Sequence, residues 1–218
     1  MAAAASALAA AVCVMAVRPS EAPSATLSVR QKLCLFHNTS TSAEDVLGMA
    51  DEELTADLLL RRGVTAVNMA SAGLGPRALH GMGVPDAQEL RNIGFTALYL
   101  VDSKFASEAN AVFGSEEVKR AFIVSASDAV SVAGTEAMHL LDISTQELLC
   151  ACAGAPTEAH AVLAQLPQGI ALHGVSASVL LDAGLRKPAL MQLGYSLTSV
   201  VAQTNASGAE LAKLGFGL

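Results

Sequence analysis

Glycine recurs along this chain at a nearly constant spacing, and that spacing restricts what the chain can fold into. Gly63, Gly73, Gly83 and Gly94 are separated by ten, ten and eleven residues. The same lattice continues through Gly114, Gly134, Gly154, Gly174, Gly184, Gly194 and Gly215. Its missing points are occupied by Lys104, Ser125, Ser144 and Asn205. A fixed short period of this kind indicates tandem structural repeats, each of which packs on its neighbours.

Two columns of apolar residues share the register of the glycines. The first column lies four residues before the lattice point: Leu59, Met69, Leu79, Leu90, Leu100, Val130, Leu140, Ile170, Leu180, Leu190, Val201 and Leu211. The second column lies directly after it: Val64, Leu74, Val84, Phe95, Phe105, Val175, Leu185, Tyr195 and Phe216. Each unit therefore reads Leu-x-x-apolar-Gly-apolar-(Ser/Thr/Pro), and the register is not an accident of glycine content.

Each unit has the sequence of a short helix that ends at the glycine. Because glycine lacks a Cβ, it adopts the left-handed conformation after the last helical turn at little cost, and Asn205 is the next best choice. The apolar residue that follows lies where the closing contact of a Schellman cap is made. We expect the next helix to restart at a capping or first-turn residue. These residues are Thr65, Pro85, Thr96, Pro156, Ser176, Ser196 and Ser207.

The units predict an all-α fold, a solenoid of short helical repeats over residues 40–218. Helices of two turns are marginal alone, so neighbouring units must bury them, and two units would form one helical hairpin of about twenty residues. The alternative is an α/β or leucine-rich-repeat-like fold, in which Leu98–Val101 and Phe122–Val124 are buried strands. Alanine, the commonest residue and the best helix former, favours helices.

The unit resembles the short Leu/Gly helical tandem repeats, of the general form Leu-Lys-x-Ala-Gly-Phe-Ser-x-x-x, that occur in many protist proteins of unknown function. The best matches are the segments Leu90–Thr96, Leu190–Ser196 and Leu211–Phe216. The resemblance covers residues 58–218 and is weaker in the middle third, where glycine and the aromatic residue are lost. It implies an architecture, and it carries no activity, cofactor or catalytic residue.

Residues 1–39 form a separate segment that begins with an Ala-rich apolar run, Ala2–Val17. Serine content and a shortage of acidic residues are typical of an organellar transit peptide, and a secretory signal and a disordered tail are the other two interpretations. The corresponding compartments are the mitochondrion or plastid, the secretory route and the cytoplasm. Since the run is short and alanine contributes little transfer free energy, we expect no permanent membrane span.

No group of side chains has the spacing of a catalytic, cofactor or metal site. The region Gly73–Gly83 is rich in glycine, but it completes neither the dinucleotide-binding pattern nor the P-loop pattern. Cys150 and Cys152 are closer together than the cysteines of most zinc sites. Ser176 lacks the second glycine of a nucleophile elbow. The histidines, which also show no ligand spacing, are His37, His80, His139, His160 and His173.

Charge argues against nucleic acid as a partner, because 13 basic residues face 20 acidic ones and the formal net charge is −7. Acidic residues gather early in the chain, where they form a solvated helix face or the polar end cap of the repeats. They are Glu44, Asp45, Asp51, Glu52, Glu53 and Asp57.

The sequence therefore predicts a non-catalytic protein-binding scaffold or a structural subunit of a larger assembly, with other proteins as partners and no cofactor. The alternative is a nucleotide- or metabolite-binding α/β enzyme that uses the region Gly73–Gly83.

Overall fold

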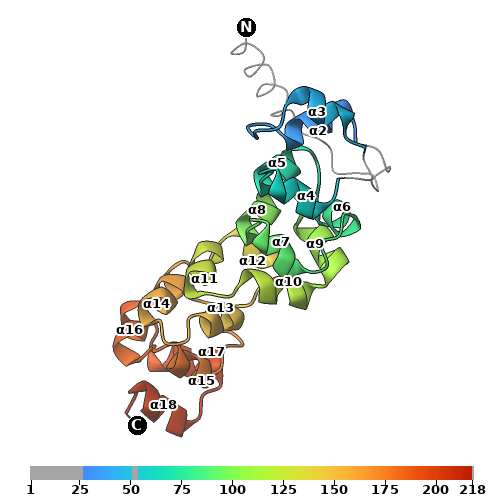
Figure 1. Cartoon of the computed structure of the whole chain (residues 1–218). Helices are drawn as coiled ribbons and strands as arrows, with labels where there is room; N and C mark the ends of the chain where they lie inside the picture. Colours follow the sequence, from blue (N-terminus) through green and yellow to red (C-terminus); the bar gives the residue numbers. More distant parts are fainter. Residues whose placement is uncertain (1–26, 51–53, 218) are drawn as a thin grey trace. The chain divides into compact units, whose positions relative to one another are not determined.

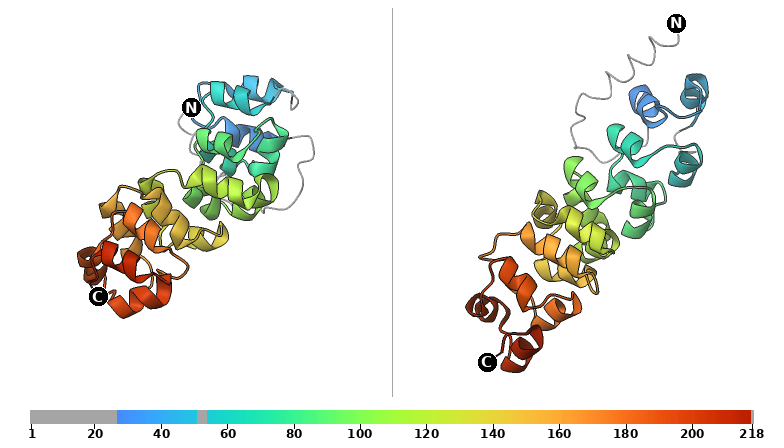
Figure 2. Two further views of the ribbon diagram at one scale, coloured as in Figure 1. Left: turned by 90° about the horizontal axis from the view of Figure 1, so that it is seen from below. Right: turned by 90° about the vertical axis from the view of Figure 1, so that its left-hand side faces the viewer.

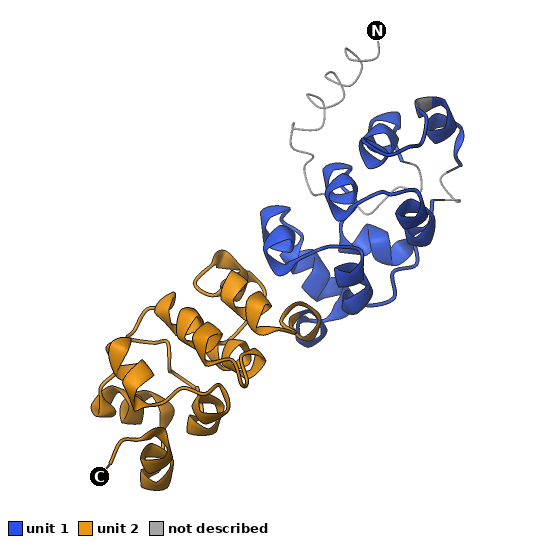
Figure 3. Cartoon of the chain, turned by 60° about the vertical axis from the view of Figure 1, so that its left-hand side comes forward, with its two compact units in different colours: residues 1–118 blue, residues 119–218 orange. Residues whose placement is uncertain are grey.

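The computed structural model describes residues 27–50 and 54–217, and throughout these residues the chain forms short α-helices and no strand (Figure 1). The chain divides into two compact units, residues 1–118 and 119–218 (Figure 3). The Ala-rich run expected to be a targeting segment lies outside the described residues. Val29–Leu35, which belong to the same N-terminal segment, form the first described helix, α2, which lies against α3 and α5.

The helices of unit 1 are α2 (Val29–Leu35), α3 (Ala43–Gly48), α4 (Ala56–Arg61), α5 (Ala66–Ser71), α6 (Pro76–Gly81), α7 (Ala87–Asn92), α8 (Ala97–Asp102) and α9 (Ala106–Phe113). The helix α10 (Ser115–Phe122) begins in unit 1 and ends in unit 2. Unit 2 continues with α11 (Ala126–Val132), α12 (Glu136–Leu140), α13 (Thr145–Ala151), α14 (Pro156–Ala164), α15 (Ala177–Asp182), α16 (Lys187–Gln192), α17 (Leu197–Thr204) and α18 (Gly208–Leu214).

The alternative α/β or leucine-rich-repeat-like fold is wrong for the described residues. Leu98–Val101, the first expected strand, lies inside α8, and Phe122 is the last residue of α10. The first run is therefore helical, and the second ends α10 and continues into its connection with α11. Short helices separated by tight turns make up each unit (Figure 2).

The glycine lattice is confirmed as a set of left-handed residues, most of which follow a helix, whereas Gly174 ends a stretch of turns. All eleven lattice glycines have positive φ, and none of the other glycines is among the positive-φ residues of the described chain. At the end of α4 the N–H of Gly63 donates to the Leu60 carbonyl at 2.9 Å, and the N–H of Val64 donates to the Leu59 carbonyl at 3.0 Å. These are the two bonds of a Schellman cap. The same pair of bonds forms around Gly73, Gly83, Gly94, Lys104, Asp142, Gly184, Gly194 and Gly215.

Two of the four non-glycine lattice points are left-handed, which confirms the prediction for Asn205, and two are not. Lys104 and Asn205 have φ of 62° and 52°, so they take the left-handed place of glycine. Ser125 and Ser144 instead have extended backbone and cap the N-termini of α11 and α13. Asp142, two residues before Ser144, ends α12 with φ of 55°. Serine is more stable as an N-cap, where its hydroxyl accepts a backbone N–H of the next helix, than in the left-handed conformation. The position of the helix end relative to the glycine lattice therefore shifts here.

Most predicted helix starts are confirmed. Each serine and threonine among them is an N-cap whose side chain accepts a backbone N–H of the first turn. Pro156 is the first residue of α14, where its missing N–H costs nothing. Pro85 is wrong as a start, because Asp86 is the N-cap of α7 and Pro85 precedes it.

The two apolar columns supply the core of both units. Every residue of the second column is buried, from Val64 to Phe216. The first column is buried at most units, and Leu59, Leu100 and Leu180 are fully covered. The column fails at Val130, which is half-buried, and at three exposed residues. Those exposed residues are Leu140, Ile170 and Val201.

Several helices pack on the third helix along the chain, and others pack on the next helix or the second one along, so the expected hairpin of two units is not the only packing unit. Neighbouring pairs include α2 with α3, α8 with α9 and α13 with α14, and α11 also packs on α13. The third-helix pairs are α2 with α5 and α6 with α9 in unit 1, and α11 with α14 and α15 with α18 in unit 2. Side chains from about thirty residues away confirm this spacing. Glu117, for example, accepts the N–H of Ala87 at 3.0 Å, and Gln146 accepts that of Ser176 at 3.2 Å.

Replacing Gly94 by alanine tests the left-handed cap. Its φ is 109° and the nearest atom to an added Cβ, that of Ala66, is 3.8 Å away, so any effect comes from the backbone conformation. We expect Gly94→Ala to lower the free energy of unfolding by about 1–2 kcal/mol. Gly81→Ala is the matched control, because Gly81 is helical and its added Cβ meets nothing within 4 Å. Equal urea midpoints for the two variants would contradict the cap.

Replacing Tyr195 by phenylalanine tests the second column. Tyr195 is 2% exposed, its hydroxyl has no hydrogen-bond partner, and burial raises its pKa. Phenylalanine occupies the same place at Phe95 and Phe216. Because a buried unpaired hydroxyl costs about 1–3 kcal/mol, we expect Tyr195→Phe to raise the melting temperature and Phe95→Tyr to lower it. A destabilised Tyr195→Phe variant would show that the hydroxyl has a partner.

Candidate protein-interaction surface

The glycine-rich region Gly73–Gly83 is not arranged as a phosphate-binding loop. Gly73 and Gly83 are the left-handed residues that end α5 and α6. At the start of α6, which has only six residues, the N–H of Arg77 donates to a carboxylate oxygen of Glu108 at 2.6 Å. An added Cβ on Gly75 would lie 2.8 Å from the ring of Phe105. The missing side chain of Gly75 therefore leaves room for α9 beside the start of α6. The Glu108 carboxylate occupies the position at this helix start that a bound anion would take.

The cysteine pair also forms no reactive or metal-binding site. Cys150 is exposed, Cys152 is buried, and both thiols are free. Burial, with the nearby Glu158 carboxylate, raises the pKa of Cys152 to about 11. Burial, with the carboxylates of Asp182 and Glu147, also raises the pKa of Cys150. Neither thiol is activated as a nucleophile. Across the described residues, no three His, Cys, Asp or Glu side chains gather as a metal site.

The other candidate side chains have structural roles. Ser176 accepts the Val179 N–H at 3.4 Å as the N-cap of α15. His80 packs edge-on to Phe113 at 5.6 Å between ring centroids, and its Nδ1 lies 2.8 Å from the Val84 carbonyl oxygen. Asp57 pairs with Arg61 on the exposed surface of α4 at 2.8 Å. Asp51, Glu52 and Glu53 of the acidic cluster lie outside the described residues.

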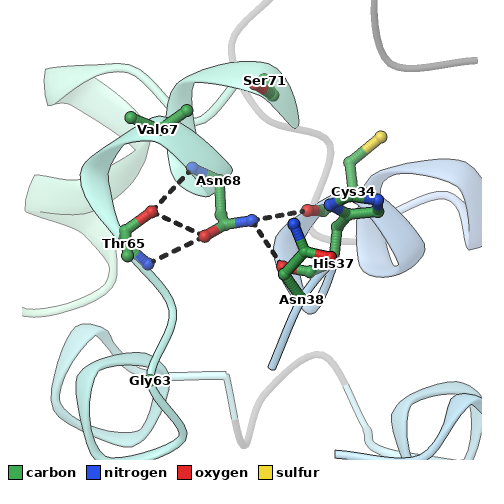
Figure 4. Close-up of a pocket in the computed structure, with 8 residues that line it drawn as sticks. All are labelled: Cys34, His37, Asn38, Gly63, Thr65, Val67, Asn68 and Ser71. Carbon is green, nitrogen blue, oxygen red and sulfur yellow. Dashed lines mark hydrogen bonds between the residues drawn. The ribbon is translucent and has the colours of Figure 1, made fainter. Parts of the chain in front are cut away.

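A cavity of about 300 Å³ opens between α2 and α5 (Figure 4). The Asn68 carboxamide joins its two walls: Nδ2 donates to the His37 carbonyl at 2.9 Å, and Oδ1 accepts from the Thr65 N–H at 3.1 Å and hydroxyl at 2.6 Å (Figure 4). The cavity is further lined by Cys34, Asn38, Gly63, Val67 and Ser71. Since Asn68 is fully used in holding α5 to α2, the cavity is a gap in a structural contact.

Unit 2 exposes large apolar side chains that the repeat pattern assigns to the core. Ile170 is 62% exposed, and Leu140 and Val201 are each 40% exposed. In each case an adjacent residue is buried instead, namely Leu141, Ala171 and Val200. The local register has therefore turned by one residue at these units, and an apolar side chain of the column faces solvent.

Two of these residues lie on elements that contact each other. Leu197 and Val201, four residues apart on α17, share one side of that helix and are both exposed. The segment that carries Ile170 is hydrogen-bonded to Gln203 of α17. Met191 on the neighbouring α16 is 56% exposed. These apolar side chains, Ile170, Met191, Leu197 and Val201, are called the unit 2 apolar surface below.

The sequence analysis missed this surface, because it assigned Ile170 and Val201 to the core column. The glycine spacing does not mark it, since Ile170 precedes Gly174 by four residues and Asn205 takes the left-handed place of glycine after Val201.

Comparison with known proteins adds no assignment. No family model, curated protein or solved structure matches this chain. Among the described residues, no helix is both long and apolar enough to cross a lipid bilayer.

Replacing Glu147 tests the electrostatics of unit 2. Burial opposes its ionisation, but hydrogen bonds from the Ser144 hydroxyl and N–H, both at 2.6 Å, and the ammonium of Lys119 outweigh burial and lower its pKa. A lowered folded-state pKa stabilises the protein above the unfolded-state pKa, and this contribution is lost as pH falls through the folded-state pKa.

We therefore expect Glu147→Gln to lower stability at pH 7 by less than about 1 kcal/mol, because the side chain is partly solvated. The difference from the wild type should vanish at acid pH, as measured by urea titrations between pH 7 and pH 3. Glu136→Gln, in the exposed first turn of α12, is the control. A Glu147→Gln effect that is the same at both ends of the pH range would contradict this account.

Proposed function

We propose that this protein is a non-catalytic protein-binding scaffold or a structural subunit of a larger assembly. The observation that carries the proposal is the exposure of Ile170 and Val201, which the repeat pattern would bury. Isolated apolar residues are common on protein surfaces, but exposed apolar side chains that a core column would bury are candidates for a contact with a partner. Two of the four residues of the unit 2 apolar surface, Ile170 and Val201, are of this kind.

The repeat architecture supports the proposal. Each short helix is stabilised by its neighbours, and arrays of such helices present extended surfaces that bind other proteins. We expect the helices of each unit to stack as a solenoid, in keeping with the resemblance to Leu/Gly tandem repeats. The Glu108 carboxylate at the start of α6, and the absence of strands from the described residues, count against the α/β enzyme alternative.

The specific form of the proposal is a subunit of an organellar or cytoskeletal assembly. Its support is the composition of residues 2–36, which suits a transit peptide, and the lack of a catalytic spacing in the sequence.

Capture from native extract tests the proposal when it is made with matched variants. The wild type should retain a stoichiometric protein partner at high salt, because an apolar contact is not screened. Ile170→Ser combined with Val201→Ser should reduce that recovery at least tenfold, since each side chain contributes about 1–2 kcal/mol of apolar burial. Val67→Ser changes a similarly exposed valine of unit 1 and should retain the partner.

Circular dichroism of the three proteins establishes that the variants are folded. Recovery of the same partners by all three proteins would contradict the assignment of the unit 2 apolar surface. Recovery of no partner by the wild type would contradict the scaffold itself.

A further inference from the structure

Residues 167–174 form a strap where the repeat pattern predicts a helix. The segment contains no α-helix, and its backbone hydrogen bonds form isolated turns. The N–H of Ala171 donates to the Pro167 carbonyl at 3.0 Å, and the N–H of His173 donates to the Ile170 carbonyl at 2.9 Å. The strap therefore lacks the cooperative hydrogen-bond ladder that stabilises the helices on either side of it.

The strap is anchored by few apolar contacts. Leu172 is fully buried and Ala171 is 2% exposed, whereas Pro167, Gln168 and Ile170 are exposed. Leu172 is thus the one large side chain that ties this segment to the core of unit 2. Segments with few buried contacts open at a lower free energy than the global unfolding of their domain.

The side chains of Gln203 and Gln168 hydrogen-bond the strap to α17 and to the end of α16. The Gln203 carboxamide of α17 accepts the N–H of Leu172 at 3.0 Å and donates to the Gln168 carbonyl at 3.3 Å. The Gln168 side chain in turn donates to the Leu193 carbonyl at the end of α16. It crosses Gly194 so closely that an added Cβ there would lie 2.8 Å from Gln168 Nε2. We call the two bonds of Gln203 the Gln203 clamp.

We infer that the strap, residues 167–174, is a conformational switch that opens and closes within folded unit 2, and that the Gln203 clamp holds it closed. Both bonds of the clamp are neutral, so each contributes only modestly to closure. Opening withdraws Leu172 from the core and moves Ile170, the most exposed residue of the unit 2 apolar surface. The presentation of that surface is thereby coupled to the state of the strap.

Native-state hydrogen exchange of the full chain tests this inference without any partner. The reporters are the amides of Ala171 and His173, because the clamp bonds neither of them directly. In the wild type we expect both to exchange with a denaturant dependence well below that of the Leu180 amide, which is bonded inside α15. In Gln203→Ala we expect them to exchange about two- to tenfold faster, with the Leu180 amide unchanged.

Gln192→Ala, at an exposed glutamine of α16, is the control and should leave the reporter amides at their wild-type rates. Reporter amides that exchange only with global unfolding, at the denaturant dependence of Leu180, would overturn the inference. A wild-type reporter rate in a folded Gln203→Ala would overturn the role of the clamp. If Gln203→Ala does not fold, the denaturant dependence measured on the wild type decides alone.

Discussion

A left-handed residue at the end of most of the short helices is the constraint on which the rest of this structure depends. It ends the helix, reverses the chain and places an apolar residue into the core one position later, as Gly63 and Val64 do after α4. Helices this short have little stability of their own, so the cap and the packing of the second column must act together. The chain gains a core by repeating one local solution rather than by forming long elements.

The packing of a helix on the third helix after it depends on long-range contacts that the ten-residue repeat does not itself contain. In unit 1, Glu108 and Glu117 accept the N–H groups of Arg77 and Ala87, thirty-one and thirty residues earlier. In unit 2, Gln146 accepts the N–H of Ser176 thirty residues later, and Gln203 accepts that of Leu172 thirty-one residues earlier. These side chains satisfy helix starts and the strap, where backbone donors have no partner inside a helix.

The local conformation was predictable from the sequence to a large degree, and the packing was not. Positive φ at the glycines follows from the chemistry of one residue, so the lattice located the helix ends correctly, and Asn205 with them. The left-handed conformation of Asp142 was not predicted, because it depends on Ser144 acting as the N-cap of the next helix. The exposure of Ile170 was not predicted either, because burial depends on how a whole unit is rotated against neighbours that are distant in sequence.

The most direct test of this account is a nuclear Overhauser spectrum that locates the sequence separation of neighbouring helices. The account predicts a cross-peak between the α-protons of Gly94 and the methyl group of Ala66, whose Cβ lies 3.8 Å from the position of a Cβ on Gly94. It predicts the same for Gly215 and the β-protons of Lys187, at 3.6 Å. Both pairs are twenty-eight residues apart. Cross-peaks between helices about twenty residues apart, with these two missing, would show hairpin packing and contradict the account.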